Sequence, residues 1–571
     1  MPIHSRWTEP IPNSSLQQWI FGSSSATLSD RKVFIDADRP DTHYVTLSEY
    51  RLLAKRIALG LQSRGLKPGD RVLLFSGNNV FFPSVFLGIL MAGGIFTGAN
   101  PGYVTRELAH QLKDSGALFM IAHEGSLHVA LEAAKEVGLS TNNVFLFDST
   151  APDLDELEKP VAEGSRHWTE LVAPRSTAER FTWIEPSDAR MATCCLNYSS
   201  GTTGVPKGVE ISHYNFVANI VGVVKVSSLP QDCETLARCY RSLCFLPMYH
   251  AYAQTIFIAR FAKEGIPTYV MPAFDFVKVL AHIQNFRITH LTAVPPILVA
   301  LTKHPATKKF DLSSLENVGC GAAPLAADVS AETERILNKP GLFVRQGWGM
   351  TEVTCSALAW DPTRRERESS VGELLPNCSA RLVDSTGKDV LEGQKSAELW
   401  ISGPIVMRRY WKNPKATTEA IVVDIDGTRW LRTGDIAYVD SYQPGALFHI
   451  VDRIKELIKV KGNQVAPAEL EALLLERSEV ADAAVIGVTI HGEEIPRAYI
   501  VLSPGSKATE KEIAEWLGNR VAKHKRLKGG VVFTDAIPRN PSGKIIRQVL
   551  RSKASEEISN WNLWISKLSH L

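Results

Sequence analysis

Apolar and polar residues alternate along the chain with two different periods, which separates candidate helices from candidate strands. Residues 42–65 combine Thr46 with leucine and isoleucine at helical spacing and stop at Gly65, so they predict an amphipathic helix. Short apolar runs between helical stretches are typical of buried strands, and they cover residues 72–75, 118–122, 144–147, 243–245 and 268–271. This alternation predicts an α/β domain.

Residues 76–105 carry no charged side chain, so a membrane-spanning helix has to be considered there. Pro83, Gly88, Gly93 and Gly94 interrupt the stretch. We therefore predict a buried helix followed by a buried strand, and no transmembrane segment. The first 15 residues have no apolar core and do not look like a signal peptide.

The C-terminal part shows a different order of elements. Residues 457–465 alternate apolar and polar side chains around a Gly-Asn pair, which predicts a hairpin with a basic exposed face. Residues 467–477 predict an acidic amphipathic helix, and residues 483–488 and 498–501 predict strands. Together these elements predict a compact α+β domain.

Two other stretches predict structure without chemistry. Residues 148–187 are rich in proline, serine and acidic side chains, which favours a surface connection. Residues 398–402 alternate like a strand, and we assign them with Gly372 to a small β-rich subdomain.

Composition narrows the class of protein. A chain of 571 residues is too long for one core and predicts two or more domains. Its 44% hydrophobic and 22% charged residues are ordinary for a globular protein, and its net charge of +2 argues against nucleic-acid binding. The eight cysteines show no metal-binding spacing, so we expect reduced thiols in an intracellular protein.

The first candidate site is the stretch 198–208, Tyr-Ser-Ser-Gly-Thr-Thr-Gly-Val-Pro-Lys-Gly. Glycines can turn successive N–H groups toward an anion, while hydroxyl groups and Lys207 add donors, so the stretch suits phosphate. An apolar run at 191–196 precedes it, and Ser212 then begins a helix-like stretch, 214–224. We therefore predict a strand, a phosphate-binding loop and a helix in succession. No Gly-Lys-Ser/Thr ends the loop, so it is not a Walker A motif.

This stretch resembles the signature of the adenylate-forming superfamily, which includes acyl-CoA synthetases, coumarate-CoA ligases, luciferase and peptide-synthetase adenylation domains. Matching motifs run from about residue 45 to about residue 550, and the coumarate-CoA ligase-like group resembles the chain most. The resemblance implies a large multi-subdomain α/β domain over residues 1–452, which binds AMP and the acid. It also implies a small mobile α+β domain over residues 453–571.

The resemblance implies a nucleotide site built from several motifs. In Gln346–Glu352 an aromatic face would stack on adenine, Thr351 would bind a phosphate oxygen and Glu352 would hold Mg²⁺. Trp348 stands where relatives usually have tyrosine, and Cys320 where they have serine or glycine. Asp435 would chelate the ribose hydroxyls. The full implied ATP/AMP set is Ser199, Ser200, Gly201, Thr202, Thr203, Gly204, Lys207, Gly321, Ala322, Ala323, Gln346, Gly347, Trp348, Thr351, Asp435, Arg453 and Lys544.

The catalytic residues implied are Lys544, His250 and Glu352. Lys544 would bridge the acid and the α-phosphate, and His250 would gate the acid pocket rather than transfer a proton. The implied pocket residues are His250, Ala251, Tyr252, Ala322, Gly347, Gly349 and Ser356. For the hinge and the coenzyme A side, the resemblance implies Lys455, Lys459, Lys461, Gly462 and Gln464.

The implied function is an ATP-dependent acid–CoA ligase that uses ATP, Mg²⁺ and coenzyme A on an aryl or medium-chain acid. Two enzymatic alternatives remain, transfer of the acyl group to a carrier protein and a luciferase-like oxygenase. A silent nucleotide-binding protein is a third alternative, which the joint presence of Thr351, Glu352, Asp435, Arg453 and Lys544 disfavours. The final Ser569-His570-Leu571 resembles a peroxisomal import signal, so we expect an import receptor as a partner and a peroxisomal location, otherwise a cytoplasmic one.

Overall fold

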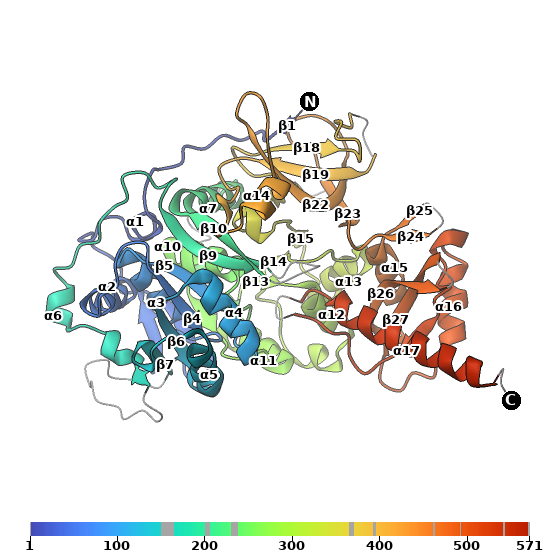
Figure 1. The fold of residues 1–571 in the computed structure, drawn as a ribbon, viewed down its shortest axis with the longest axis horizontal. Coiled ribbons are helices and arrows are strands. Elements are labelled where there is room, and N and C mark those ends of the chain that lie inside the picture. Colours follow the sequence, from blue (N-terminus) through green and yellow to red (C-terminus); the bar gives the residue numbers. More distant parts are fainter. Residues whose placement is uncertain are drawn as a thin grey trace.

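A computed structural model describes residues 2–149, 165–199, 206–229, 238–364, 370–391, 395–460, 463–490, 493–540 and 543–568. It confirms an α/β architecture with a small C-terminal α+β part, which lies to the right of the larger body in Figure 1. No helix of the described residues is long and apolar enough to cross a membrane.

One sheet of the large body positions most of the candidate site. Its strands, in spatial order, are β15 (Val344–Gln346), β14 (Asn317–Cys320), β13 (His290–Ala293), β11 (Ser242–Cys244), β12 (Thr268–Val270), β2 (Lys32–Asp36) and β3 (Tyr44–Thr46). Its neighbouring strands run parallel except for β2 and β3. The carboxyl ends of β14 and β15 therefore share one edge, where ligands of open α/β sheets bind.

A second sheet carries the phosphate-loop stretch. Its spatial order is β20 (Arg409–Tyr410), β10 (Lys207–Ser212), β9 (Thr193–Ser199), β5 (Ile95–Ala99), β4 (Arg71–Phe75), β6 (Phe119–His123), β7 (Val144–Phe147) and β8 (Arg166–His167). Strand β9 pairs antiparallel with β10, with Ser199 opposite Lys207. The predicted strand–loop–helix order was therefore wrong, because the loop joins two strands and the helix starts only after β10. Sequence reasoning missed strand β10, although its Gly-Val-Glu-Ile-Ser residues alternate as in a strand.

A third, antiparallel sheet is the expected β-rich part and sits at the top of Figure 1. Its strands are β1 (Ile3–His4), β18 (Ser379–Val383), β19 (Ala397–Ser402), β22 (Arg429–Val439) and β21 (Ile421–Val423), with β23 (Phe448–Arg453) also paired to β22. A short pair, β16 (Leu358–Ala359) and β17 (Glu373–Leu374), lies near Gly372.

Helices of the large body cover these sheets, and their ends follow local signals. Thr46 caps α2 by accepting a hydrogen bond from the Glu49 N–H, and Ser212 caps α7 in the same way through Asn215. The helices are α1 (Leu16–Phe21), α2 (Leu47–Ser63), α3 (Phe82–Met91), α4 (Thr105–Ser115), α5 (Leu127–Val137), α6 (Arg175–Ala178), α7 (His213–Ser227), α9 (Ala251–Ala253), a π-helix (Gln254–Phe261), α10 (Ala262–Glu264), α11 (Phe276–Phe286), α12 (Pro295–Lys303), α13 (Ala327–Leu337) and α14 (Pro414–Ala420).

The uncharged stretch 76–105 is a core helix and strand, as predicted. Every residue of α3 and of β5 is buried. A Cβ on Gly88 would lie 2.8 Å from Cβ of Ile57, so this glycine lets α3 pack closely against α2. The segment is apolar because it lies inside the protein.

The stretch 148–187 is not simply a surface connection. Residues 150–164 lie outside the described part, but Trp168 and Leu171 are each 1% exposed and join the main core. The large aromatic ring of Trp168 stabilises this segment by burial, an effect that average composition does not reveal.

The C-terminal part has its own hydrophobic clusters, built from residues after position 457. Its strands β26 (Val480–Ile490), β27 (Glu493–Leu502) and β28 (Val531–Phe533) form one sheet, with α15 (Pro467–Leu475), α16 (Glu510–Gly518) and α17 (Arg547–Leu568) around it. The predicted hairpin is present as β24 (Ile458–Val460) and β25 (Asn463–Val465). Asn463 pairs with Val460 inside the ladder, so it is a strand residue and not a turn residue.

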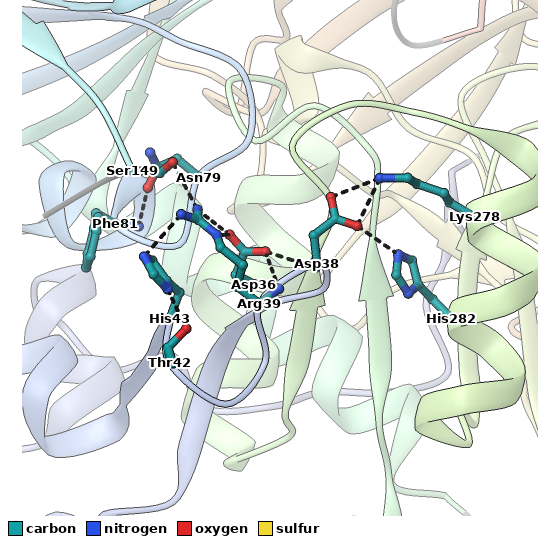
Figure 2. A network of polar contacts seen from close by, with 10 residues as sticks. All are labelled: Asp36, Asp38, Arg39, Thr42, His43, Asn79, Phe81, Ser149, Lys278 and His282. Carbon is teal, nitrogen blue, oxygen red and sulfur yellow. Dashed lines mark hydrogen bonds and ion pairs between the residues drawn. The ribbon is translucent and has the colours of Figure 1, made fainter. Parts of the chain in front are cut away.

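A polar network ties together segments beyond the carboxyl end of β2. Arg39 donates a hydrogen bond to Asp36 Oδ2 at 2.7 Å and another to the Ser149 hydroxyl at 3.1 Å, as Figure 2 shows. In the same figure Lys278 of α11 donates to both oxygens of Asp38, at 3.0 and 3.1 Å. The loop after β2 is thus cross-linked to a neighbouring helix and to the end of β7, which indicates a structural role.

Candidate active site

Lys544 lies in a loop that packs against the large body. The backbone N–H of Lys544 donates to Asn540 Oδ1 at 2.9 Å, and the Arg539 guanidinium donates to the Gly543 carbonyl at 2.7 Å. Gly543 has φ of +82°, and a Cβ there would lie 3.1 Å from Val294, immediately after β13. A side chain at 543 is therefore disfavoured twice, by backbone strain and by space. This contact places Lys544 at the edge where the parallel strands end.

The electrostatic surroundings of Lys544 come from three other segments of the chain. Burial, helped by the positive charge of Arg453, lowers the pKa of its amine to about 8, although Asp435 and Glu352 oppose the change. The structure thus gathers Lys544, Arg453, Asp435 and Glu352, four of the residues singled out in the sequence. A buried ammonium near two carboxylates can neutralise an anion that enters the site.

Asp435 is held from both sides. The indole Nε1–H of Trp348 donates to Asp435 Oδ2 at 2.8 Å, and Arg453 Nε lies 3.0 Å from Oδ1. Asp435 and Arg453 face each other across β22 and β23. The Asp435 N–H also donates to Thr433 Oγ1 at 3.1 Å. The carboxylate is 4% exposed and therefore has a fixed orientation.

Glu352 is joined to the phosphate-loop side by Tyr410. The Tyr410 hydroxyl donates to Glu352 Oε1 at 2.9 Å, and Lys207 Nζ lies 4.9 Å from the centre of the same ring. Burial and the Glu352 carboxylate raise the pKa of Tyr410, so the phenol stays protonated as a donor. Sequence reasoning missed Tyr410, because only the pairing of β20 with β10 brings it to the site.

The donor set around Glu352 fits Mg²⁺ better than zinc. Among the described residues no group of three or more histidine, cysteine, aspartate or glutamate side chains could hold a metal ion. Mg²⁺ usually takes one or two carboxylates and fills its other positions with phosphate and water. Glu352, 6% exposed, would be such a carboxylate.

The small-residue loop after β14 is fastened by Gln346. Its amide oxygen accepts from the Leu325 N–H at 3.0 Å and its amide nitrogen donates to the Leu325 carbonyl at 3.3 Å. This side chain therefore positions the loop that carries Ala322 and Ala323. Ala322 has φ of 72°, a strained conformation of the kind that clusters at functional sites.

Gly349 permits a close backbone crossing. A Cβ at this position would lie 1.7 Å from the Cys355 carbonyl oxygen, so no other residue fits without moving that segment. Thr354, in the same segment, has φ of 68°. The glycine thus shapes the turn that carries Thr351 and Glu352.

His250 is a neutral imidazole. Its Nδ1 accepts from the Tyr252 N–H at 3.3 Å and caps α9, which leaves Nε2 to carry the proton. Burial, together with the positive charge of Lys544, lowers its pKa to about 4. A neutral donor agrees with the expected gating role rather than with a general base.

The pocket candidates place small groups around Tyr252. A Cβ on Gly321 would lie 3.2 Å from the Tyr252 hydroxyl, so ring and loop are in contact. Burial raises the pKa of the Tyr252 phenol, and the nearby thiols of Cys320 and Cys355 also contribute to this increase. Ala251 is buried, whereas Ser356 and Gly347 are half-buried. These side chains are uncharged, which suits an apolar acyl tail.

Several predicted residues either fall outside the described residues or lie away from this cluster. Ser200, Gly201, Thr202, Thr203, Gly204, Lys461, Gly462, Ser569, His570 and Leu571 lie outside the described residues. Lys455, Lys459 and Gln464 are exposed, and Figure 1 shows β24 and β25 apart from β14 and β15. The structure therefore has Lys544 at the site while the hairpin is away from it.

Comparison with protein families gives matches over most of the chain. Residues 22–411 match the family of AMP-binding enzymes, and residues 469–544 match the AMP-binding enzyme C-terminal domain. Phenylacetyl-CoA ligase epaB of Aspergillus niger is 35% identical over 96% of this chain and 98% of that protein. Peroxisomal OPC-8:0-CoA ligase 1 of Arabidopsis thaliana is 36% identical over 94% of this chain and 93% of that protein.

Solved structures agree on the fold. ATP-bound MatB from Rhodopseudomonas palustris superimposes with a TM-score of 0.78 at 27% identity, covering 94% of this chain and 98% of that one. The anthranilate CoA ligase AuaEII with anthranoyl-AMP gives a TM-score of 0.81 over 96% of this chain and 99% of that one. At 23% identity this second match supports the fold alone.

Proposed function

The chain belongs to the AMP-binding enzyme family, and we propose that it activates an aryl or medium-chain carboxylic acid at the site around Lys544. It is an AMP-forming acid–CoA ligase with the adenylate-forming fold, and ATP and coenzyme A are its co-substrates. The observation that carries the proposed site is the convergence of Glu352, Asp435 and Arg453 on the buried amine of Lys544.

In the first step a carboxylate oxygen of the acid attacks the α-phosphorus of ATP and pyrophosphate leaves. Negative charge accumulates around phosphorus, so positioning and electrostatics supply most of the catalysis. In the proposed complex the Lys544 ammonium would contact both the acid and the α-phosphate, and Asp435 would accept the ribose hydroxyls. The 198–208 stretch with Lys207 would hold the outer phosphates. Mg²⁺ held through Glu352 would neutralise phosphate charge.

In the second step the thiol of coenzyme A attacks the acyl carbon, and AMP leaves with the bonding electron pair. We divide the chain at 452/453, so that residues 453–571 form a small domain that rotates between the steps. The exposed Lys459 and Gln464 of the hairpin would then face the site, with Lys455 at the hinge. One small domain would in this way serve two reactions.

The acid class rests on the pocket side chains and on the relatives. Tyr252 offers an uncharged aromatic face with the thiols of Cys320 and Cys355 nearby, and Gly321 lets the loop approach the ring closely. An aryl-substituted or medium-chain tail fits such surroundings better than a second carboxylate, which would be desolvated without a partner. The name of the phenylacetyl-CoA ligase, which matches over nearly the whole chain, points the same way.

A direct assay tests this proposal. Purified protein is incubated with ATP, Mg²⁺, coenzyme A and a panel of aromatic, medium-chain, long-chain and dicarboxylic acids, and acyl-CoA and AMP are followed together. Thioester formation with an aryl or medium-chain acid is expected. A preference for long-chain or dicarboxylic acids would contradict the proposed acid class. Adenylate without acyl-CoA would favour a carrier protein as acceptor, and oxygen-dependent turnover a luciferase-like reaction.

The proposed location is the peroxisome. A relative named as a peroxisomal ligase supports it, together with the Ser569-His570-Leu571 signal resemblance. A fluorescent protein fused to the N-terminus should colocalise with a peroxisomal marker. Replacing Leu571 by aspartate should release it to the cytoplasm, and unchanged localisation would rule out this signal.

A further inference from the structure

The edge of the Trp348 ring makes a polar contact of its own. Its Nε1–H donates to Asp435 Oδ2 at 2.8 Å, in surroundings where Trp348 is 9% exposed and Asp435 is 4% exposed. Such a bond between a neutral donor and a buried carboxylate is strong, because water does not compete for either group. Adenine stacking, expected from the ring face, would leave this edge contact in place.

The backbone of Trp348 is itself firmly held. Its N–H donates to the Leu358 carbonyl at 3.1 Å, and its carbonyl accepts from Ala357 at 3.0 Å and from Leu358 at 3.1 Å. The preceding Gly347 N–H donates to the Cys320 carbonyl at 3.0 Å. The indole nitrogen therefore presents its proton from a fixed position at the end of β15.

The two partners of Asp435 differ in origin. Arg453 is the last residue of β23, where the proposed small domain begins, and its Nε lies 3.0 Å from Oδ1. Trp348 belongs to the large domain, as Asp435 does. If the small domain turns, the indole contact is the one that keeps the plane of the carboxylate fixed. An aspartate side chain needs such a contact, because its terminal torsion is broad.

We propose that Trp348 is a positioning residue for ribose recognition, its indole N–H orienting Asp435 so that the carboxylate can accept both ribose hydroxyls. This inference rests on the proposed function, in which Asp435 binds the ribose. It assigns to Trp348 a role that a phenylalanine with the same stacking face would not perform.

The test compares ATP with 2′,3′-dideoxyATP in the adenylation half-reaction of Trp348→Phe. The variant keeps an aromatic face and removes the donor, so the KM for ATP should rise about tenfold or more, the scale of a lost hydrogen bond to a charged group. The kcat at saturating ATP should change little. The KM for the dideoxy nucleotide should stay within about twofold, since the ribose contact is already absent.

A matched control exists on the same strand as Asp435. Trp430 donates its indole N–H to Asp424 Oδ2 at 2.9 Å, outside the proposed nucleotide site. Trp430→Phe removes an equivalent bond and should leave both KM values unchanged. If Trp348→Phe does not fold, 3-benzothienylalanine at position 348, which carries sulfur in place of the N–H, makes the same comparison with the ring shape retained.

The outcomes separate the two proposals. A selective loss of ATP binding in Trp348→Phe supports the positioning role, and an equal loss with both nucleotides overturns it in favour of stacking or packing alone. Asp435→Ala should lose the discrimination between ATP and the dideoxy nucleotide. If that variant keeps the discrimination, the ribose role of Asp435 is wrong, and the inference about Trp348 fails with it.

Discussion

The ionisation of Lys544 gives a quantitative test of the site. Burial and Arg453 lower the pKa of its amine to about 8 in the free enzyme. With that pKa, about nine-tenths of the molecules carry the ammonium at pH 7 and about one-tenth at pH 9. Because kcat/KM reports the free enzyme, the adenylation kcat/KM should fall about tenfold between pH 7 and pH 9. A lysine with its ordinary pKa would give a flat profile over this range.

The assay follows pyrophosphate release from acid and ATP without coenzyme A. Lys544→Ala should be slower by at least about a hundredfold, the scale of losing a preorganised charged donor, and its remaining rate should not show the basic limb. Lys544→Arg keeps a charge at all pH values used, so its rate, although reduced by the different geometry, should also lack that limb. Lys511, with a side chain 84% exposed, provides the control substitution to alanine, which should leave the profile unchanged.

Two results would refute this reasoning. A flat wild-type profile between pH 7 and pH 9 would mean that the Lys544 amine is not buried as described. Normal adenylate formation by Lys544→Ala would remove this residue from the chemistry altogether.

Three further predictions concern packing, domain docking and acid stability. Gly349→Ala should lower the free energy of unfolding, measured in urea, by about 3 kcal/mol or more, because the added Cβ would overlap the Cys355 carbonyl. The control Gly319→Ala should be nearly neutral, because a Cβ there would meet no atom within 4 Å. Lys303→Met removes the ammonium that donates to the last carbonyl of α15, at 3.0 Å, and to the first carbonyl of β26, and so weakens docking of the small domain on the large one. Adenylation should slow about tenfold while thioester formation from added acyl-adenylate persists, and an equal loss of both steps would contradict this docking role. Burial lowers the pKa of His213 to about 4, so as the pH falls the unfolded chain binds a proton at this histidine before the folded chain does. The free energy of unfolding should therefore decrease by up to about 3 kcal/mol between about pH 6.5 and pH 4, and His213→Asn should make this decrease shallower in urea titrations.

The candidate residues of the site could be named from the sequence because they stand in short motifs. Lys544, Glu352 and Asp435 each belong to a stretch whose residue types carry their function wherever the chain places them. The cap at Ser212 was equally predictable, since a cap is made by residues three positions apart. The helix predicted from residue 42 begins only at Leu47, because Tyr44–Thr46 form strand β3. The buried helix and strand within 76–105 followed from the position of proline and glycine in an apolar run.

Strand pairing was harder to predict than the local motifs. The phosphate-loop stretch connects antiparallel strands, and Trp168 is buried within a segment of polar composition. In both places contacts with distant residues decide the local structure, and a window of neighbouring residues does not contain them.

By itself the sequence determined which groups are available for catalysis, because their identities and the local turns around them are encoded within a few residues. The tertiary structure alone decided how those groups are held. The Trp348 indole is 87 positions from Asp435, and the Tyr410 hydroxyl is 58 positions from Glu352. Only the packing of separate sheets closes these distances, since hydrogen bonding requires atoms within about 3 Å and carries no signal along the chain.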